Sequence, residues 1–114
     1  MRRETFLDGY LACALWSSSL PLLGEWTSEA RKQAEKTCAD FMADNADALE
    51  RYYEKTARPE SYAGHDLWLT RNGHGAGFWD RCNNDAFPEL CKAAEELGEQ
   101  HPYQGDDNKI YFYG

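Results

Sequence analysis

Residues 64–81 read GHDLWLTRNGHGAGFWDR, and the expected fold of the middle of the chain depends on this stretch. From His65 to Thr70 the side chains alternate between two faces, as they do in a strand. Asn72-Gly73 follows, which is the strongest short signal for a two-residue hairpin turn. Residues 78–81 then form the returning strand. The stretch therefore predicts a β-hairpin.

The residues before this stretch predict helices. Apolar side chains recur at helical spacing over residues 4–17 and again over residues 29–55. Thr27 or Ser28 is the expected N-cap of the second segment. A break near Asn45 leaves open whether that segment is one long helix or two stacked ones. Arg58-Pro59 ends it, because proline disfavours a helical residue before it.

The residues after the stretch predict one more helix and a second hairpin. The helix covers residues 87–98, with Leu90, Ala94 and Leu97 facing inward. The hairpin joins residues 101–104 to residues 109–113 through a turn. The predicted fold is a single α+β domain over residues 1–114, with about three helices on a small antiparallel sheet of two hairpins.

The composition fits one soluble domain that does not bind polyanions directly. The chain has 114 residues, of which 42% are hydrophobic and 14% aromatic. That is enough for a core without a metal or disulfide as a precondition. Twenty acidic against 12 basic residues give a formal net charge of -8. This charge argues against nucleic acid or an anionic membrane as the partner.

No segment predicts membrane insertion, secretion or a cofactor. The apolar runs are shorter than the ~18 residues that a membrane helix needs. The four cysteines, at positions 13, 38, 82 and 91, form no C-x-x-C pair. We expect reduced cysteines, with Cys13 and Cys38 on the apolar faces of helices; a disulfide and a metal site are the alternatives.

Residues 64–81 also carry most of the residue types that perform chemistry. His65, Asp66, His74 and Asp80 would provide metal ligands or an acid/base pair if a hairpin joined them. The glycines of residues 73–77 would offer amides to a phosphate, helped by Arg71 and Arg81. The structural alternative, which we favour, is that these side chains fix the turn by hydrogen bonds. The complete candidate set of this stretch is His65, Asp66, Arg71, Asn72, His74, Asp80 and Arg81.

Acidic residues form two candidate partner-binding clusters. The first follows one helical stripe and consists of Asp40, Asp44, Asp47 and Glu54. The second lies near the C-terminus and includes Glu95, Glu96, Asp106 and Asp107. Such a surface imitates phosphate spacing and attracts a basic groove, although solvated helices carry similar stripes. Trp79 and Tyr111 are the candidate aromatic anchors if they are exposed.

Residues 64–81 resemble the signature of short, mostly uncharacterised proteins encoded by bacteriophages and mobile elements. In that family Phe or Leu stands where this chain has Leu67, and the ending at residues 105–111 is also similar. The resemblance implies a phage or prophage origin and transfers no catalytic residue. Small phage proteins of this size often inhibit host defence, and anti-CRISPR proteins are among them.

The sequence therefore favours a non-enzymatic inhibitor in the cytoplasm of a bacterial host. It would bind a defence protein or nucleoprotein complex through its acidic surface and occlude the site where nucleic acid is held. One alternative is a small enzyme or metal-dependent module that uses residues 65–81. A phage structural or assembly accessory is the other alternative.

Overall fold

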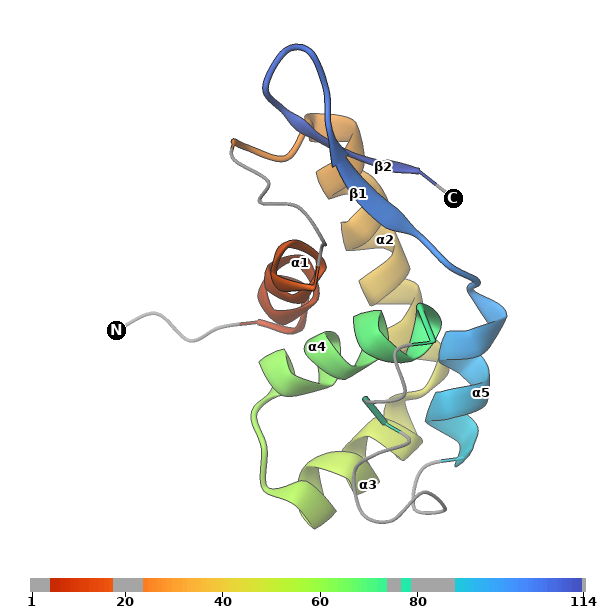
Figure 1. Ribbon diagram of the computed structural model, residues 1–114. Helices are drawn as coiled ribbons and strands as arrows, with labels where there is room; N and C mark the ends of the chain where they lie inside the picture. Colours follow the sequence, from red (N-terminus) through yellow and green to blue (C-terminus); the bar gives the residue numbers. More distant parts are fainter. Residues whose placement is uncertain (1–4, 18–23, 74–76, 79–87, 114) are drawn as a thin grey trace.

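The computed structural model describes residues 5–17, 24–73, 77–78 and 88–113 (Figure 1). Over these residues the chain forms five helices and one two-stranded antiparallel sheet. The hairpin of the sheet projects at one end of an elongated molecule, α3 lies at the other end, and α4 crosses between them. In chain order the elements are α1 (Phe6–Trp16), α2 (Ser28–Asp44), α3 (Ala46–Thr56), α4 (Glu60–Arg71), α5 (Pro88–Glu96), β1 (His101–Gln104) and β2 (Ile110–Tyr113).

The predicted fold class is correct as α+β but wrong in its elements. Five helices and one hairpin replace the expected three helices and two hairpins in the part of the chain that the structure describes. The predicted strand at residues 65–70 lies inside α4. Residues 66–71 are all buried, so the alternation does not separate a core face from a solvent face. A helix enclosed on all sides lacks the one-sided pattern by which helices are recognised.

Asn72-Gly73 ends α4 and does not form a hairpin turn. Asn72 is the C-cap, and Gly73 follows with φ of 66°, the left-handed conformation that commonly ends a helix. The chain then returns across α4. The amide of Phe78 donates to Thr70 Oγ1 at 3.1 Å, and the Phe78 ring lies 5.9 Å from that of Phe41. Gly77 and Phe78 are not in a strand, and residues 79–81 of the predicted returning strand lie outside the described residues.

The other predicted elements are confirmed. Thr27 caps α2, since its side chain accepts from the amide of Ala30 at 3.0 Å. The segment after it consists of two helices that separate at Asn45. The terminal hairpin pairs His101 with Tyr113 and Gln104 with Ile110. Local signals, namely caps, periodicity and turn residues, determine each of these features.

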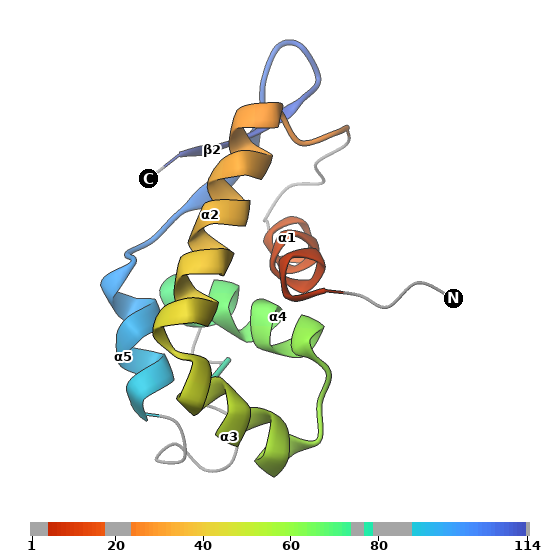
Figure 2. The same cartoon turned by 180° about the vertical axis from the view of Figure 1, so that it is seen from behind.

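Two glycines bring α1 and α4 into direct backbone contact. A Cβ atom on Gly9 would overlap the carbonyl oxygen of Ser61, and a Cβ atom on Gly64 would overlap that of Phe6. The two helices pack against each other in both views of the molecule (Figures 1 and 2). Close approach of this kind is available only where glycine stands on the contact face.

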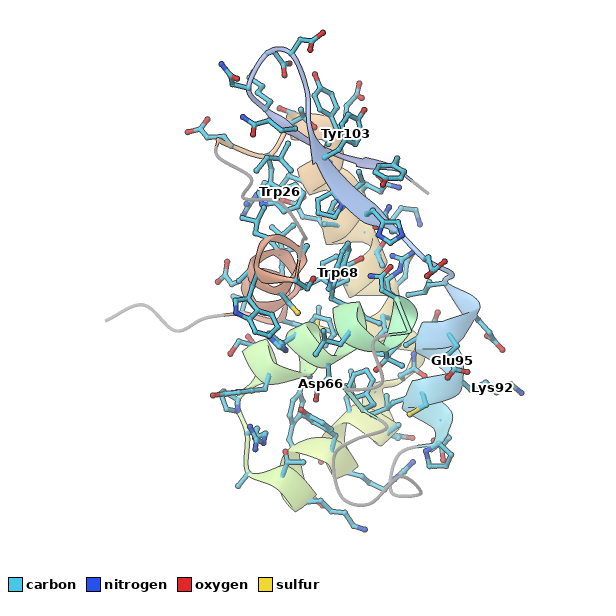
Figure 3. All side chains as sticks on the ribbon, in the orientation of Figure 1. Trp26, Asp66, Trp68, Lys92, Glu95 and Tyr103 are labelled. Atoms are coloured by element: carbon cyan, nitrogen blue, oxygen red, sulfur yellow. The ribbon has the colours of Figure 1, made fainter. Side chains whose placement is uncertain are left out.

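The core joins this helix pair to the hairpin through aromatic rings. Trp68 of α4 is 1% exposed, and its ring lies 5.3 Å from Tyr10 and 5.7 Å from Phe112 of β2. The ring of Trp26 also lies close to that of Phe112, at 4.7 Å. Figure 3 shows Trp68 between α1 and α2, with Trp26 toward the hairpin. None of the helices that the structure describes is both long and apolar enough to cross a membrane.

Candidate functional site

Asp66 of the predicted catalytic set is a core residue. It is 0% exposed and accepts a hydrogen bond of 2.6 Å from the hydroxyl of Tyr52 on α3. Figure 3 places it on the side of α4 that faces α3. A carboxylate that is closed off from solvent in this way holds two helices together and does not meet a substrate.

Arg71 connects three parts of the chain from inside the fold. Its Nε and Nη2 atoms donate to the carbonyl oxygens of Gly98 and Leu97, at 2.8 and 3.1 Å. Its Nη1 atom donates to the Tyr10 hydroxyl at 2.9 Å and to Gln100 Oε1 at 3.2 Å. The positive guanidinium lies at the C-terminal end of α5, where the helix dipole is negative. Its donors are thus used to stabilise the fold, and none of these contacts leaves it directed at a phosphate.

Asn72 fixes the segment that leads from α5 to the hairpin. Its Nδ2 atom donates to the carbonyl of Trp68 at 3.0 Å, and its Oδ1 atom accepts from the amide of Gln100 at 2.8 Å. The histidines and aspartates of residues 64–81 were expected to fix a turn by bonding the backbone, whereas the side chains that do so among the described residues are Asn72, Arg71 and Thr70. The backbone that they hold belongs to a helix end, not to a hairpin.

His65 of the candidate set lies on α4 beside the end of α1. It is half-buried on α4, where its ring lies 5.7 Å from that of Trp16. His74, Trp79, Asp80 and Arg81 lie outside the described residues. Within the ranges that the structure covers, no group of three or more His, Cys, Asp or Glu side chains is placed to hold a metal ion.

Three of the cysteines are free thiols in the core, and Cys13 and Cys38 lie on buried helix faces as predicted. Burial raises the pKa of both thiols to about 12 from an ordinary value of 9.0. Burial likewise raises the pKa of the Tyr10 hydroxyl to about 12, although Arg71 opposes the shift. These groups therefore stay protonated in the folded protein at neutral pH.

This arrangement predicts a loss of stability in alkali. In the unfolded chain the thiols ionise near pH 9, whereas in the fold they keep their protons up to about pH 12. The free energy of unfolding is therefore expected to be constant up to about pH 9 and to fall as the pH rises from 9 toward 12. Urea unfolding across this range measures the slope. The slope should decrease in a Cys13→Ala, Cys38→Ala variant, and an unchanged slope would contradict the assignment.

An acidic groove lies between α2 and α5. Its volume is about 500 Å³, and Asp40, Asp44 and Glu96 lie along it. Phe41, Ala93 and Leu97 supply its apolar surface. Figure 2 shows α5 beside the C-terminal half of α2. Members of two clusters that are far apart in the sequence thus meet across one groove, which we call the α2/α5 groove.

The carboxylates of the α2/α5 groove stand where they destabilise their own helices. Asp44 ends α2 and Glu96 ends α5, and neither helix has a basic residue in its last turn. The C-terminal end of a helix dipole is negative, so acids there are unfavourable by about 0.3–1 kcal/mol each. Arg71 binds the carbonyl oxygens of Leu97 and Gly98 just after α5, so the negative potential of the groove comes from the side-chain charges and from the C-terminal end of α2.

One cation offsets part of this charge. Lys36 Nζ lies 2.7 Å from Asp40 Oδ2, one helical turn away. Both side chains are largely exposed, at 78% and 60%, and an exposed pair of this kind contributes little to stability. A cationic group of a partner can therefore displace Lys36 at small cost.

The remaining predicted acidic residues are dispersed. Asp47 lines a smaller hollow of about 270 Å³ beside Asp44 and Glu89, and Glu89 pairs with Arg51 at 2.8 Å. Glu95 points outward from α5 with Lys92 (Figure 3). The other exposed members lie on α3 or at the turn of the hairpin, and these are Glu54, Asp106 and Asp107.

Tyr111 and Leu97 differ from the roles expected of them. Tyr111 is half-buried, and its hydroxyl donates to Asp107 Oδ2 at 2.5 Å. This bond raises the pKa of Tyr111 and lowers that of Asp107.

Leu97 was expected to face inward and is 41% exposed, because it follows the last residue of α5 and leaves the buried face. The apolar surface of the groove was missed for this reason.

Comparison with protein-family models, with curated proteins and with solved structures finds no match to this chain.

Proposed function

We propose that this protein is a binding protein that inhibits a host defence complex, in the manner of an anti-CRISPR protein. Its target would be a basic groove that normally holds DNA or RNA, in the cytoplasm of a bacterial host. The resemblance of residues 64–81 to phage-encoded proteins supports the biological setting. The α2/α5 groove supports the mode of binding.

The observation that carries the proposal is the meeting of Asp40, Asp44 and Glu96 beside an apolar surface. Carboxylates alone are common on solvated helices and carry little information. Here they line the same groove as Phe41 and Leu97, and two of them lie at helix ends that an acid destabilises. A surface that attracts cations and also excludes water is suited to a lysine- or arginine-bearing protein surface.

The proposed mechanism is occlusion of the nucleic-acid site. Opposite charges accelerate the encounter and make it sensitive to salt, while the apolar contacts slow dissociation. The described part of the signature favours this mechanism over the enzyme, since Asp66, Arg71 and Asn72 are used inside the fold. The signature would then serve to hold α1, α4 and α5 in the arrangement that forms the groove.

Neutralising the groove should abolish inhibition. The test variant is Asp40→Asn, Asp44→Asn, Glu96→Gln, and the control variant is Glu25→Gln, Glu50→Gln, Glu60→Gln, which removes equal charge outside the groove and outside both candidate clusters. We expect the test variant to bind its target about 10- to 100-fold more weakly, at about 0.5–1 kcal/mol per carboxylate. The control should change binding by less than about 3-fold.

The measurement is phage plaque formation on bacteria with active CRISPR systems of several types that express each variant. The wild-type protein and the control are expected to protect the phage, and the test variant is not. Equal loss in both variants would mean that net charge, and not the groove, determines the effect. Lack of protection by the wild-type protein in every system would contradict the proposed function.

A further inference from the structure

The terminal hairpin has two chemically different faces. In register, His101 pairs with Tyr113 and Tyr103 with Tyr111, which places four rings on one face. The Tyr103 ring lies 5.3 Å from Tyr111, with 15° between their planes, and 5.5 Å from Tyr113. The His101 and Tyr113 rings are also 5.5 Å apart. We call this set of four rings the aromatic face.

The aromatic face is exposed to solvent, although side chains as large as these four are usually buried in a core. Tyr103 is 41% and Tyr113 56% exposed. The opposite face anchors the hairpin, since Ile110 is 0% exposed and Phe112 packs between Trp26 and Trp68. Cross-strand ring pairs stabilise a hairpin, but this hairpin is already anchored by Ile110 and Phe112, so four outer rings are more than this role needs.

The charge near the aromatic face selects its partner. Asp106 and Asp107 form the turn of the hairpin, and Lys109 is the only Lys or Arg between residues 101 and 113. Acidic surroundings and a net charge of -8 disfavour phosphate-bearing ligands. Tyrosine rings attract cations through their π faces, and arginine stacks on them better than lysine.

The molecule already contains one contact of this kind. The guanidinium carbon of Arg58 lies 5.0 Å from the centre of the Tyr62 ring, and that ring is 43% exposed. An exposed tyrosine of this chain thus binds arginine within the same molecule. Tyr103 and Tyr113 present similar exposed rings, and no arginine is present in the hairpin to cover them.

We propose that the aromatic face binds arginine side chains of a basic protein segment. The guanidinium groups stack on Tyr103 and Tyr113, and the acidic turn of the hairpin and the net charge of -8 attract the basic segment. This surface is distinct from the α2/α5 groove, whose lining residues lie within 36–45 and 93–97 and include no residue of the hairpin. The inference goes beyond the proposed function and holds for any arginine-bearing partner.

Calorimetric titration with nona-arginine and nona-lysine peptides tests the proposal. The two peptides carry equal charge, so electrostatic attraction alone gives similar affinities. Stacking on two exposed rings should make nona-arginine bind about 5-fold tighter, at about 0.5 kcal/mol for each ring. In Tyr103→Thr, Tyr113→Thr the preference should fall below about 2-fold, while Tyr62→Ala, a control of similar exposure on α4, should keep it.

Two further measurements distinguish arginine stacking from binding in the α2/α5 groove and from self-association of the protein. The groove variant Asp40→Asn, Asp44→Asn, Glu96→Gln should weaken both peptides alike and preserve the arginine preference, even if the proposed inhibition is wrong. Thermal unfolding and sedimentation of the double tyrosine variant show whether it is folded and whether its self-association has changed. An arginine preference that persists without Tyr103 and Tyr113 would overturn the proposal. The proposal would also be overturned if the wild-type protein formed concentration-dependent dimers that disappear in this variant, because the aromatic face would then bind a second copy of the chain. Binding of neutral oligosaccharides in place of the peptides would overturn it as well.

Discussion

Gly64→Ala is expected to lower the free energy of unfolding by about 3 kcal/mol. The added methyl group would overlap the carbonyl oxygen of Phe6, so α1 and α4 would have to separate. Alanine is favoured over glycine within a helix by about 1 kcal/mol, and this helix would otherwise become more stable. A decrease in stability can therefore come only from the helix contact. Thermal unfolding should show a melting temperature lower by about 10 °C.

Gly73→Ala is the matched control for this prediction. Gly73 has φ of 66°, and a Cβ atom there would meet nothing within 4 Å. Its cost should be the conformational term alone, about 1–2 kcal/mol. If Gly64→Ala were as stable as the wild-type protein, the close approach of α1 and α4 would be wrong, and with it the arrangement of helices around the groove.

Arg71→Met is expected to destabilise the protein by about 3 kcal/mol or more. The substitution leaves two carbonyl oxygens at the end of α5, the Tyr10 hydroxyl and Gln100 without their buried donor. Methionine keeps much of the packing volume, so the loss reports the hydrogen bonds. Arg71→Lys should recover only part of the stability, because an ammonium cannot reproduce the planar fork of a guanidinium.

Arg51→Met is the control for the Arg71 prediction. Arg51 forms an ion pair with Glu89, but its side chain is 54% exposed. Its removal should cost less than about 1 kcal/mol in urea unfolding. A stable Arg71→Met protein that lost binding would reverse the account, since Arg71 would then be a functional residue and not a structural one.

The elements that could be predicted from the sequence are those that local signals determine. α1, the cap at Thr27, the break at Asn45 and the terminal hairpin depend on signals within a few residues, and these predictions are confirmed. The prediction for residues 65–70 fails because tertiary contacts bury residues 66–71 on every side of the helix. Six residues of alternation then resemble a strand, and Asn-Gly serves equally well as a helix end.

The α2/α5 groove could be predicted only in part, because only some of its residues are brought together by local structure. Asp40 and Asp44 share a helical stripe, so their proximity follows from the sequence. That Glu96 and Leu97 line the same groove as Asp40 and Asp44 depends on how α5 packs on α4 and α3, and no local pattern encodes those contacts. Of the aromatic face only Tyr111 was predicted as a partner-binding residue, although alternation in residues 109–113 indicates which rings share a side.

The most direct test of the central claim is affinity capture from a bacterial lysate with active defence systems. The tagged wild-type protein, the groove variant and its equal-charge control are each used at low and at high salt, and retained proteins are identified by mass. We expect the wild-type protein and the control to retain a nucleoprotein defence complex at low salt and to release it at high salt, and the groove variant to retain none. Retention of the same complex by the groove variant, or an empty capture by the wild-type protein at both salts, would contradict the account.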